Sequence, residues 1–135
     1  MAVLVIEWMK YIKQTQPDLY KSAKMEMIMD PWELGKDFIA RGAPCLIQGY
    51  ARKEDRTAQP AVTIAIAHIQ LAANALGFGT CWAGYFNQAS QLYPPLQQAI
   101  GLPEGYISYG TFVIGHSAEK YQWIPARKPV EVTWR

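Results

Sequence analysis

The stretch GFGTCWAGYF, residues 77–86, holds three glycines, one cysteine and four aromatic residues, and it carries no charge. One interpretation is a tight connection from a helix into a buried strand, in which Trp82, Tyr85 and Phe86 fill the core. The other is the wall of a site for a planar ligand, because a glycine such as Gly84 lets the backbone approach a ring closely. The ten residues by themselves leave both interpretations open.

The preceding segment, residues 60–76, is predicted to be a helix that begins at Pro60 and is capped by Gly77. It is rich in alanine and apolar almost all round, which predicts burial on every side. His68 in its middle is therefore expected to be a hydrogen-bonded interior histidine. A domain of 135 residues seldom covers such a helix alone, so we expect a second subunit to cover part of it.

Helices and one strand are expected before this helix. Apolar residues at helical spacing predict an amphipathic helix over residues 2–13, and a second helical stretch follows over residues 17–27. The sequence DPWE, residues 30–33, has the composition of a helix start, and this helix is expected to run to Arg41. The apolar run APCLIQGY, residues 43–50, is predicted to be an interior strand.

After the glycine-rich stretch, the pattern continues with short elements. We expect a strand near residues 80–83, a helical region over 88–100 that two prolines interrupt, and a buried strand over 107–115. The tail PARKPVEVTWR, residues 125–135, is predicted to be extended. Helices that alternate with a few short strands predict one α/β or α+β domain over residues 1–135.

Composition argues against several classes of protein. The net charge of +2, with basic residues scattered, does not favour a nucleic-acid partner. We expect neither a signal peptide nor a membrane-spanning segment, and hence a cytoplasmic protein without a membrane partner. Cys45 and Cys81 lie far apart in apolar surroundings and are interpreted as reduced core thiols. With no Cys-x-x-Cys and no Cys/His cluster, no metal site is predicted.

The sequence carries no motif for a catalytic machine of its own. It contains no G-x-G-x-x-G after a strand, no Walker A motif and no G-x-S-x-G elbow. Neither of the two histidines is paired with a nucleophile in the sequence, so the catalytic residues stay unknown. An enzyme built from this chain is expected to take its reactivity from a cofactor.

Three runs of sequence together resemble a known family: GAPCLIQGYARKEDRTAQPAVTIAIAHIQLAANALGFGTCWAGYF, YPPLQQAIGLPEGYISYGTFVIGHSAEKY and IPARKPVEVTWR. They are similar to the C-terminal portion of the nitroreductase family of FMN-dependent oxidoreductases, most of all to members with an N-terminal ferredoxin-like extension. The resemblance implies an α+β sandwich, an intertwined homodimer and FMN at the dimer interface. It also implies electron transfer from NAD(P)H or another donor to a small aromatic acceptor, a nitroaromatic or a quinone.

The resemblance also assigns candidate cofactor-binding residues. Trp82, Ala83, Gly84 and Tyr85 match the segment whose backbone faces the isoalloxazine ring of FMN. Arg127 matches a basic residue that reaches the FMN phosphate, and Lys128 is a second candidate for that role. The alternative for Arg127 is a solvated charge of the tail.

The chain also departs from the family pattern. The Arg-rich opening motif and the Pro-Ser/Thr…Asn…Gln-Pro segment that contact FMN in the family do not occur, and the ferredoxin-like cysteines are missing as well. We therefore expect a single partial nitroreductase-like domain without the N-terminal FMN-binding half. Three hypotheses follow: an FMN-dependent oxidoreductase, a truncated non-catalytic dimeric remnant or ligand-binding module, and an accessory subunit of a separately encoded N-terminal half. Met25, Met27 and Met29 are expected either to line a lid for aromatic substrates or to pack a short helix onto the core.

Overall fold

The structure is a computed structural model that describes residues 1–118, 122–123 and 125–134. Its helices are α1 (Ala2–Thr15), α2 (Pro17–Ser22), α3 (Glu26–Glu33), α4 (Ala58–Ala75), α5 (Gly84–Leu92) and α6 (Pro94–Ile100). Its strands are β1 (Cys45–Arg52), β2 (Gly79–Trp82) and β3 (Tyr106–Gly115). The expected α+β architecture is confirmed.

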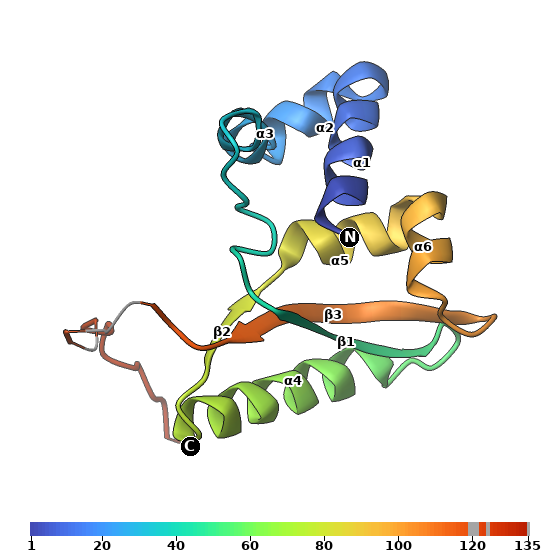
Figure 1. Cartoon of the computed structure of the whole chain (residues 1–135). Helices are drawn as coiled ribbons and strands as arrows, with labels where there is room; N and C mark the ends of the chain where they lie inside the picture. Colours follow the sequence, from blue (N-terminus) through green and yellow to red (C-terminus); the bar gives the residue numbers. More distant parts are fainter. Residues whose placement is uncertain (119–121, 124, 135) are drawn as a thin grey trace.

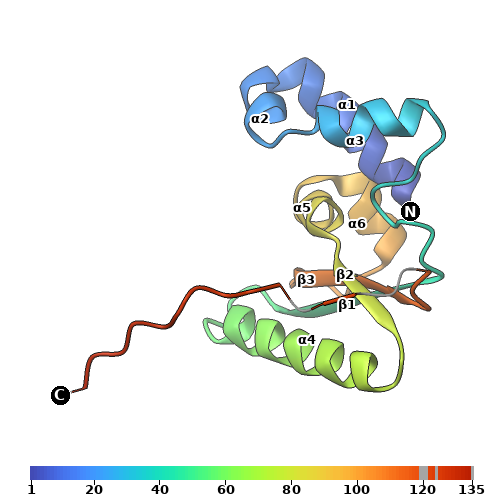
Figure 2. The ribbon, with the colours of Figure 1, turned by 90° about the vertical axis from the view of Figure 1, so that its left-hand side faces the viewer.

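The three strands form an antiparallel sheet in the order β1-β3-β2, with helices on both faces (Figures 1 and 2). Helix α4 packs on one face, against β1, β2 and β3. Helix α5 packs on the other face against β3, and α1 lies on α5, so that α1, α2 and α3 form an outer layer. The expected strand over residues 43–50 is present, but it lies at an edge of the sheet and is not interior.

The main core lies between the sheet and the helices on the α5 side. It includes Val5, Trp8 and Met9 of α1 with Phe86 of α5 and Val113 of β3. Met25 and Met29 are buried in this core, whereas Met27 is exposed. The methionines of α3 and the turn before it therefore divide between core packing and the surface.

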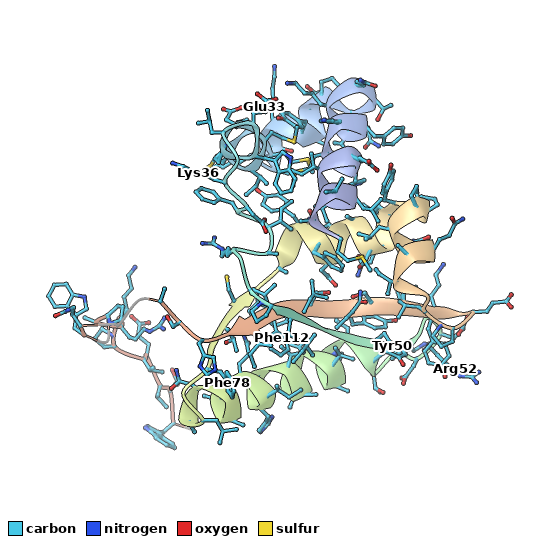
Figure 3. All side chains as sticks on the ribbon, in the orientation of Figure 1. Glu33, Lys36, Tyr50, Arg52, Phe78 and Phe112 are labelled. Carbon is cyan, nitrogen blue, oxygen red and sulfur yellow. The ribbon has the colours of Figure 1, made fainter. Side chains whose placement is uncertain are left out.

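A pair of glycines brings α4 close to the sheet. Gly49 of β1 and Gly110 of β3 are register partners, and both lie under α4. A Cβ added at Gly110 would lie 2.5 Å from Ile66 Cδ1 and 3.1 Å from the ring of Trp82. Phe112, two residues further along β3, is fully buried between the sheet and α4 (Figure 3). Without side chains at positions 49 and 110, Ile66 packs directly on the backbone of the strands.

Helix α4 has the expected extent, and Gly77 (φ +82°) ends it as predicted. The amides of Gly77 and Phe78 donate to the carbonyls of Asn74 and Ala73, which is a Schellman motif. The expectation of burial on every side is wrong for this chain, because only Ala58, Ile66 and Ala73 are buried.

Four side chains of α4 and β1 lie in surroundings other than those expected. Ile64 and Leu71, seven residues apart on the outward face of α4, are 57% and 71% exposed. His68 is exposed as well, although its Nδ1 lies 2.8 Å from the Ile64 carbonyl, as a hydrogen-bonded histidine should. Cys45 is exposed on the edge strand and is not a core thiol. Cys45 pairs with Ile114 of β3, and Cys81 pairs with the adjacent residue Val113. Neighbouring residues of a strand point to opposite faces of the sheet, and so do the two free cysteines.

The predicted helix from DPWE to Arg41 is wrong. Pro31 lies inside α3, which starts at Glu26 and ends at Glu33. Gly35 (φ +75°) stops the helix, because its amide donates to Trp32 and the Lys36 amide donates to Pro31, a second Schellman motif. The expected helical stretch over 17–27 is likewise split, by a turn in which Lys24 has φ +52°.

Most of the remaining expectations for the second half of the chain hold. Strand β2 and helix α6 lie where the pattern predicts them, with Tyr93 as the break between α5 and α6. Helix α5 begins at Gly84, four residues before the expected start at residue 88. Strand β3 is the buried central strand. The described residues of the tail, 122–123 and 125–134, form no helix or strand, and they are exposed and lead away from the sheet (Figure 2).

Candidate functional site

A cleft of about 360 Å³ lies at the end of β2, where the chain passes into α5. One side consists of residues of this junction and of α5: Trp82, Ala83, Gly84, Tyr85, Phe86 and Gln88. The other side comes from the α2–α3 region and the loop before β1: Ala23, Ile28, Phe38, Ile39 and Arg41. The cleft thus joins two segments that lie more than forty residues apart in the sequence.

The junction side is fixed by the sheet. The Ala83 amide donates to the Thr111 carbonyl at 2.9 Å, which continues the pairing with β3 for one residue beyond β2. The chain then turns into α5 at Gly84, with Ala83 as the N-cap residue and no side-chain cap. The first amides of a helix have no acceptor within the helix, so this turn offers backbone donors at the cleft.

The fold itself does not require a glycine at position 84, in the junction between β2 and α5. Its φ is not in the left-handed region, and a Cβ added to it would meet nothing within 4 Å. This is the opposite of Gly110, where Ile66 fills the space. Because Gly84 is exposed and lines the cleft, the missing side chain leaves room for something outside the chain.

Tyr85 connects the two sides of the cleft through a hydrogen bond. Its hydroxyl donates to the Ala23 carbonyl at 2.8 Å, in the turn between α2 and α3. Burial, and then the nearby Glu26 carboxylate, raise the pKa of Tyr85 above its ordinary value. The hydroxyl therefore stays protonated at neutral pH, and its proton is engaged in a structural hydrogen bond.

The opposite side of the cleft is a loop that begins after Gly35, at Lys36 (Figure 3). The Asp37 carboxylate accepts hydrogen bonds from the amides of Ile39 and Ala40, both at 2.9 Å, and so holds the loop in a turn. Arg41 follows in the left-handed region with φ +55°, an uncommon conformation for a residue with a Cβ. Its guanidinium carbon lies 6.0 Å from the centre of the Phe38 ring, within the range of a cation–π contact.

The structure brings four of the six predicted site residues together. Trp82, Ala83, Gly84 and Tyr85 all line the cleft, although the Trp82 ring also extends toward Gly110 on the α4 side of the sheet. Arg127 and Lys128 are exposed in the tail and do not line this cleft.

Sequence reasoning missed Phe38 and Arg41, because it placed residues 36–41 in a helix. The signals that could have found them are Gly35 as a helix stop and Asp37 as a turn residue.

The lining of the cleft limits its chemistry. No carboxylate, imidazole or thiol belongs to it among the residues that the structure describes. Within the same residues, no group of three His, Cys, Asp or Glu side chains could hold a metal ion, and no helix is long and apolar enough to cross a membrane. The cleft offers backbone amides, aromatic side chains and one guanidinium, which suit a planar ligand with polar edges.

Sheet, helices and cleft together define an α+β domain with a cleft at a strand-to-helix junction. The chain belongs to the nitroreductase family, whose sequence pattern matches residues 2–116. The fold is that of the family, and the family resemblance seen in the sequence is confirmed. No curated protein matches the chain.

Solved structures of the same family share the fold. A nitroreductase from Bacteroides fragilis with bound FMN has 25% identity and a TM-score of 0.55, over 69% of this chain and 50% of its own. An FMN-dependent nitroreductase from Clostridium difficile has 25% identity and a TM-score of 0.52, over 69% of this chain and 57% of its own. A nitroreductase-like protein from Bacillus cereus, 23% identical with a TM-score of 0.52, covers 85% of this chain and 57% of its own and shows the fold alone. The chain therefore spans about half the length of these relatives.

Proposed function

We propose that the chain is an FMN-dependent oxidoreductase, which passes electrons from NAD(P)H or another donor to a nitroaromatic or quinone acceptor. The observation that carries the proposal is Gly84: a glycine without a conformational or packing reason, at an open helix start that lines an aromatic cleft. Two findings support the same proposal. The chain belongs to the nitroreductase family, and it is similar to one relative solved with FMN and to another described as FMN-dependent.

The residues of the cleft fit the ring of FMN. Its isoalloxazine ring would lie against the backbone of Trp82, Ala83, Gly84 and Tyr85. The free amides at the start of α5 would donate hydrogen bonds to the heteroatoms on its edge. The bound flavin would supply the two-electron chemistry, since the described residues that line the cleft include no carboxylate, imidazole or thiol. The role of the protein would then be to orient the flavin ring and to exclude water from one face of the ring.

The phosphate of FMN needs cations, and Arg127 and Lys128 are the proposed ones. Arginine suits this role because its planar fork binds phosphate oxygens in pairs. Both residues lie in a tail that leads away from its own cleft, so we propose that they act within a homodimer, at the site of the other subunit (Figure 2). The exposed apolar face of α4 supports such a dimer.

The proposal is tested by the visible spectrum and the activity of the purified protein. We expect flavin absorbance before or after the addition of FMN, and NADH or NADPH oxidation that accelerates when a quinone or a nitroaromatic is added. A protein that takes up no FMN, or that binds FMN and shows no turnover with any donor, would contradict the assignment as an oxidoreductase.

The second candidate is a dimeric binding module without catalysis. The observation that favours it is the charge distribution, because Arg41 is the one charged side chain that lines the cleft within the described part of the chain. This candidate predicts a folded dimer that binds a planar ligand without turnover. Activity that FMN alone restores would exclude it.

A further inference from the structure

We infer that Arg41 makes the cleft selective for aromatic acceptors that carry a carboxylate. The inference rests on the proposed function and names the substrate class of the same site. It follows from the charge of the cleft, from the way the loop holds Arg41, and from the place of Arg41 opposite Gly84.

The charge of the cleft is the first step. Arg41 is its only charged lining residue in the ranges that the structure describes, and Gln88 and Tyr85 are the neutral polar ones. The Glu26 carboxylate, which contributes to the raised pKa of Tyr85, does not line the cavity. A ligand at the mouth of this cleft therefore meets a positive charge that no carboxylate of the lining neutralises.

The loop is the second step. Asp37 holds the backbone of residues 39 and 40, and Arg41 adopts the left-handed conformation directly after them. The guanidinium lies over the Phe38 ring at 6.0 Å. A guanidinium can bind a carboxylate through two parallel N–H groups, and an aromatic ring beside it can stack on the ring of the ligand. In an aromatic acid, Arg41 would therefore bind the carboxylate and Phe38 would contact the ring.

The position of the two sides is the third step. Gly84 and the open amides lie on the α5 side, and Phe38 and Arg41 lie on the loop side. If the flavin occupies the side with the open amides, the acceptor is left with the side that presents Phe38 and Arg41. The anionic group recognised by Arg41 then belongs to the acceptor and not to the cofactor.

The test compares 4-nitrobenzoate with 4-nitrobenzamide, which differ in charge and little in shape. Dissociation constants are measured by calorimetry on the protein with excess FMN and without a reductant, so that binding is read without turnover. We expect the wild type to favour nitrobenzoate, and Arg41→Gln to lower this preference about fivefold, the range of a partly exposed ion pair. Gln keeps the Cβ and the backbone conformation, Arg41→Lys should retain part of the preference, and Arg56→Gln, an exposed arginine outside the cleft, should retain all of it.

Several results would overturn the inference. One is an unchanged preference in Arg41→Gln, and another is no measurable binding of either compound. A third is an Arg41→Gln variant that keeps the acceptor preference and the affinity for riboflavin but loses affinity for FMN. Arg41 would then bind the phosphate of the cofactor and not the acceptor. If the protein takes up no FMN, the proposed function fails, and the same titrations on the flavin-free protein decide whether Arg41 selects an aromatic carboxylate.

Discussion

Single residues show that glycine has two different roles in this chain. At Gly110 the side chain is missing because Ile66 and Trp82 occupy its space, and at Gly84 it is missing although the space is open. The first glycine is explained by packing of α4 on the sheet. For the second, packing gives no reason, and the proposed function assigns it to a ligand that approaches the start of α5.

The two glycines predict opposite outcomes for the same substitution. Gly110→Ala should lower the free energy of unfolding by about 1–3 kcal/mol, because its Cβ forces Ile66 and the Trp82 ring to move. Gly84→Ala should change it by less than about 1 kcal/mol, since alanine fits a helix start better than glycine and meets no neighbour. Urea unfolding of both variants measures the difference. Equal destabilisation would show that Gly84 has a packing role that we have not identified.

Tyr85 shows why a candidate site residue need not be a chemical one. The family resemblance predicted its position at the flavin, and the structure places it in the cleft. Its hydroxyl nevertheless donates to the Ala23 carbonyl, and burial raises its pKa. Within the proposed site Tyr85 is therefore a residue that holds the α2–α3 turn in place, not a proton donor.

The helices and strands differ in how well the sequence predicts them. Helix α4, strand β3 and the break at Tyr93 are predicted correctly, because Gly77, the apolar run and the two prolines act locally. The error at residues 30–41 has a local cause too: DPWE resembles a helix start, but the stop at Gly35 decides where the helix ends. The edge position of β1 and the one-sided burial of α4 depend on strand order and packing, which no local pattern contains.

The same limit applies to the candidate site. The segment Trp82–Tyr85 is predicted from the family resemblance, because the grouping of glycine and aromatic residues by itself leaves its role open. Phe38 and Arg41 come from a distant segment, which the Tyr85–Ala23 hydrogen bond and the packing of Ile39 in the core with Phe86 hold at the cleft. Their role depends on tertiary structure and could not be read from the loop alone.

The start of α4 predicts a pH dependence. The Asp55 carboxylate accepts hydrogen bonds from the Thr57 hydroxyl at 2.7 Å and the Thr57 amide at 2.8 Å, and these bonds lower its pKa from the ordinary value of 3.8. Since the folded state favours the ionised form, this contribution to stability is present above about pH 4 and is lost as the pH falls through the lowered pKa. Asp55→Asn, which resembles the protonated form, should therefore melt below the wild type at pH 7, and the difference should shrink at acidic pH as Asp55 of the wild type becomes protonated.

Thermal melts of both proteins across this range give the answer. Asp37→Asn serves as a comparison, because Asp37 also bonds backbone amides but lies in the loop before β1. A melting difference between wild type and Asp55→Asn that is the same at neutral and at acidic pH would show that the charge of Asp55 does not stabilise the start of α4.

The molecule as a whole has one helix face without cover. Helix α4 covers one face of the sheet (Figure 1), and Ile64 and Leu71 on this helix are exposed. Exposed apolar residues in such a row are typical of an interface between subunits. For the whole molecule we therefore propose a homodimer in which the partner subunit covers α4 and the tail of each subunit reaches the other.

The dimer is tested on α4. Leu71→Glu should shift the protein from dimer to monomer in sedimentation velocity at micromolar concentration, while its circular dichroism stays that of a folded chain, because Leu71 is 71% exposed. Leu92→Glu, at an exposed leucine of α5, is the matched control and should remain dimeric. A wild-type protein that sediments as a monomer would contradict the homodimer.

The central claim is that FMN binds at the junction of β2 and α5, against Gly84. The most direct measurement is a titration of FMN fluorescence with the wild type and with Gly84→Ala, after urea unfolding has established that the variant is stable. The account predicts saturable quenching by the wild type, and an affinity at least about tenfold weaker in Gly84→Ala, about 1.4 kcal/mol, because the new Cβ occupies the place of the ring. Equal affinity of the two proteins, or no binding by either, would contradict it.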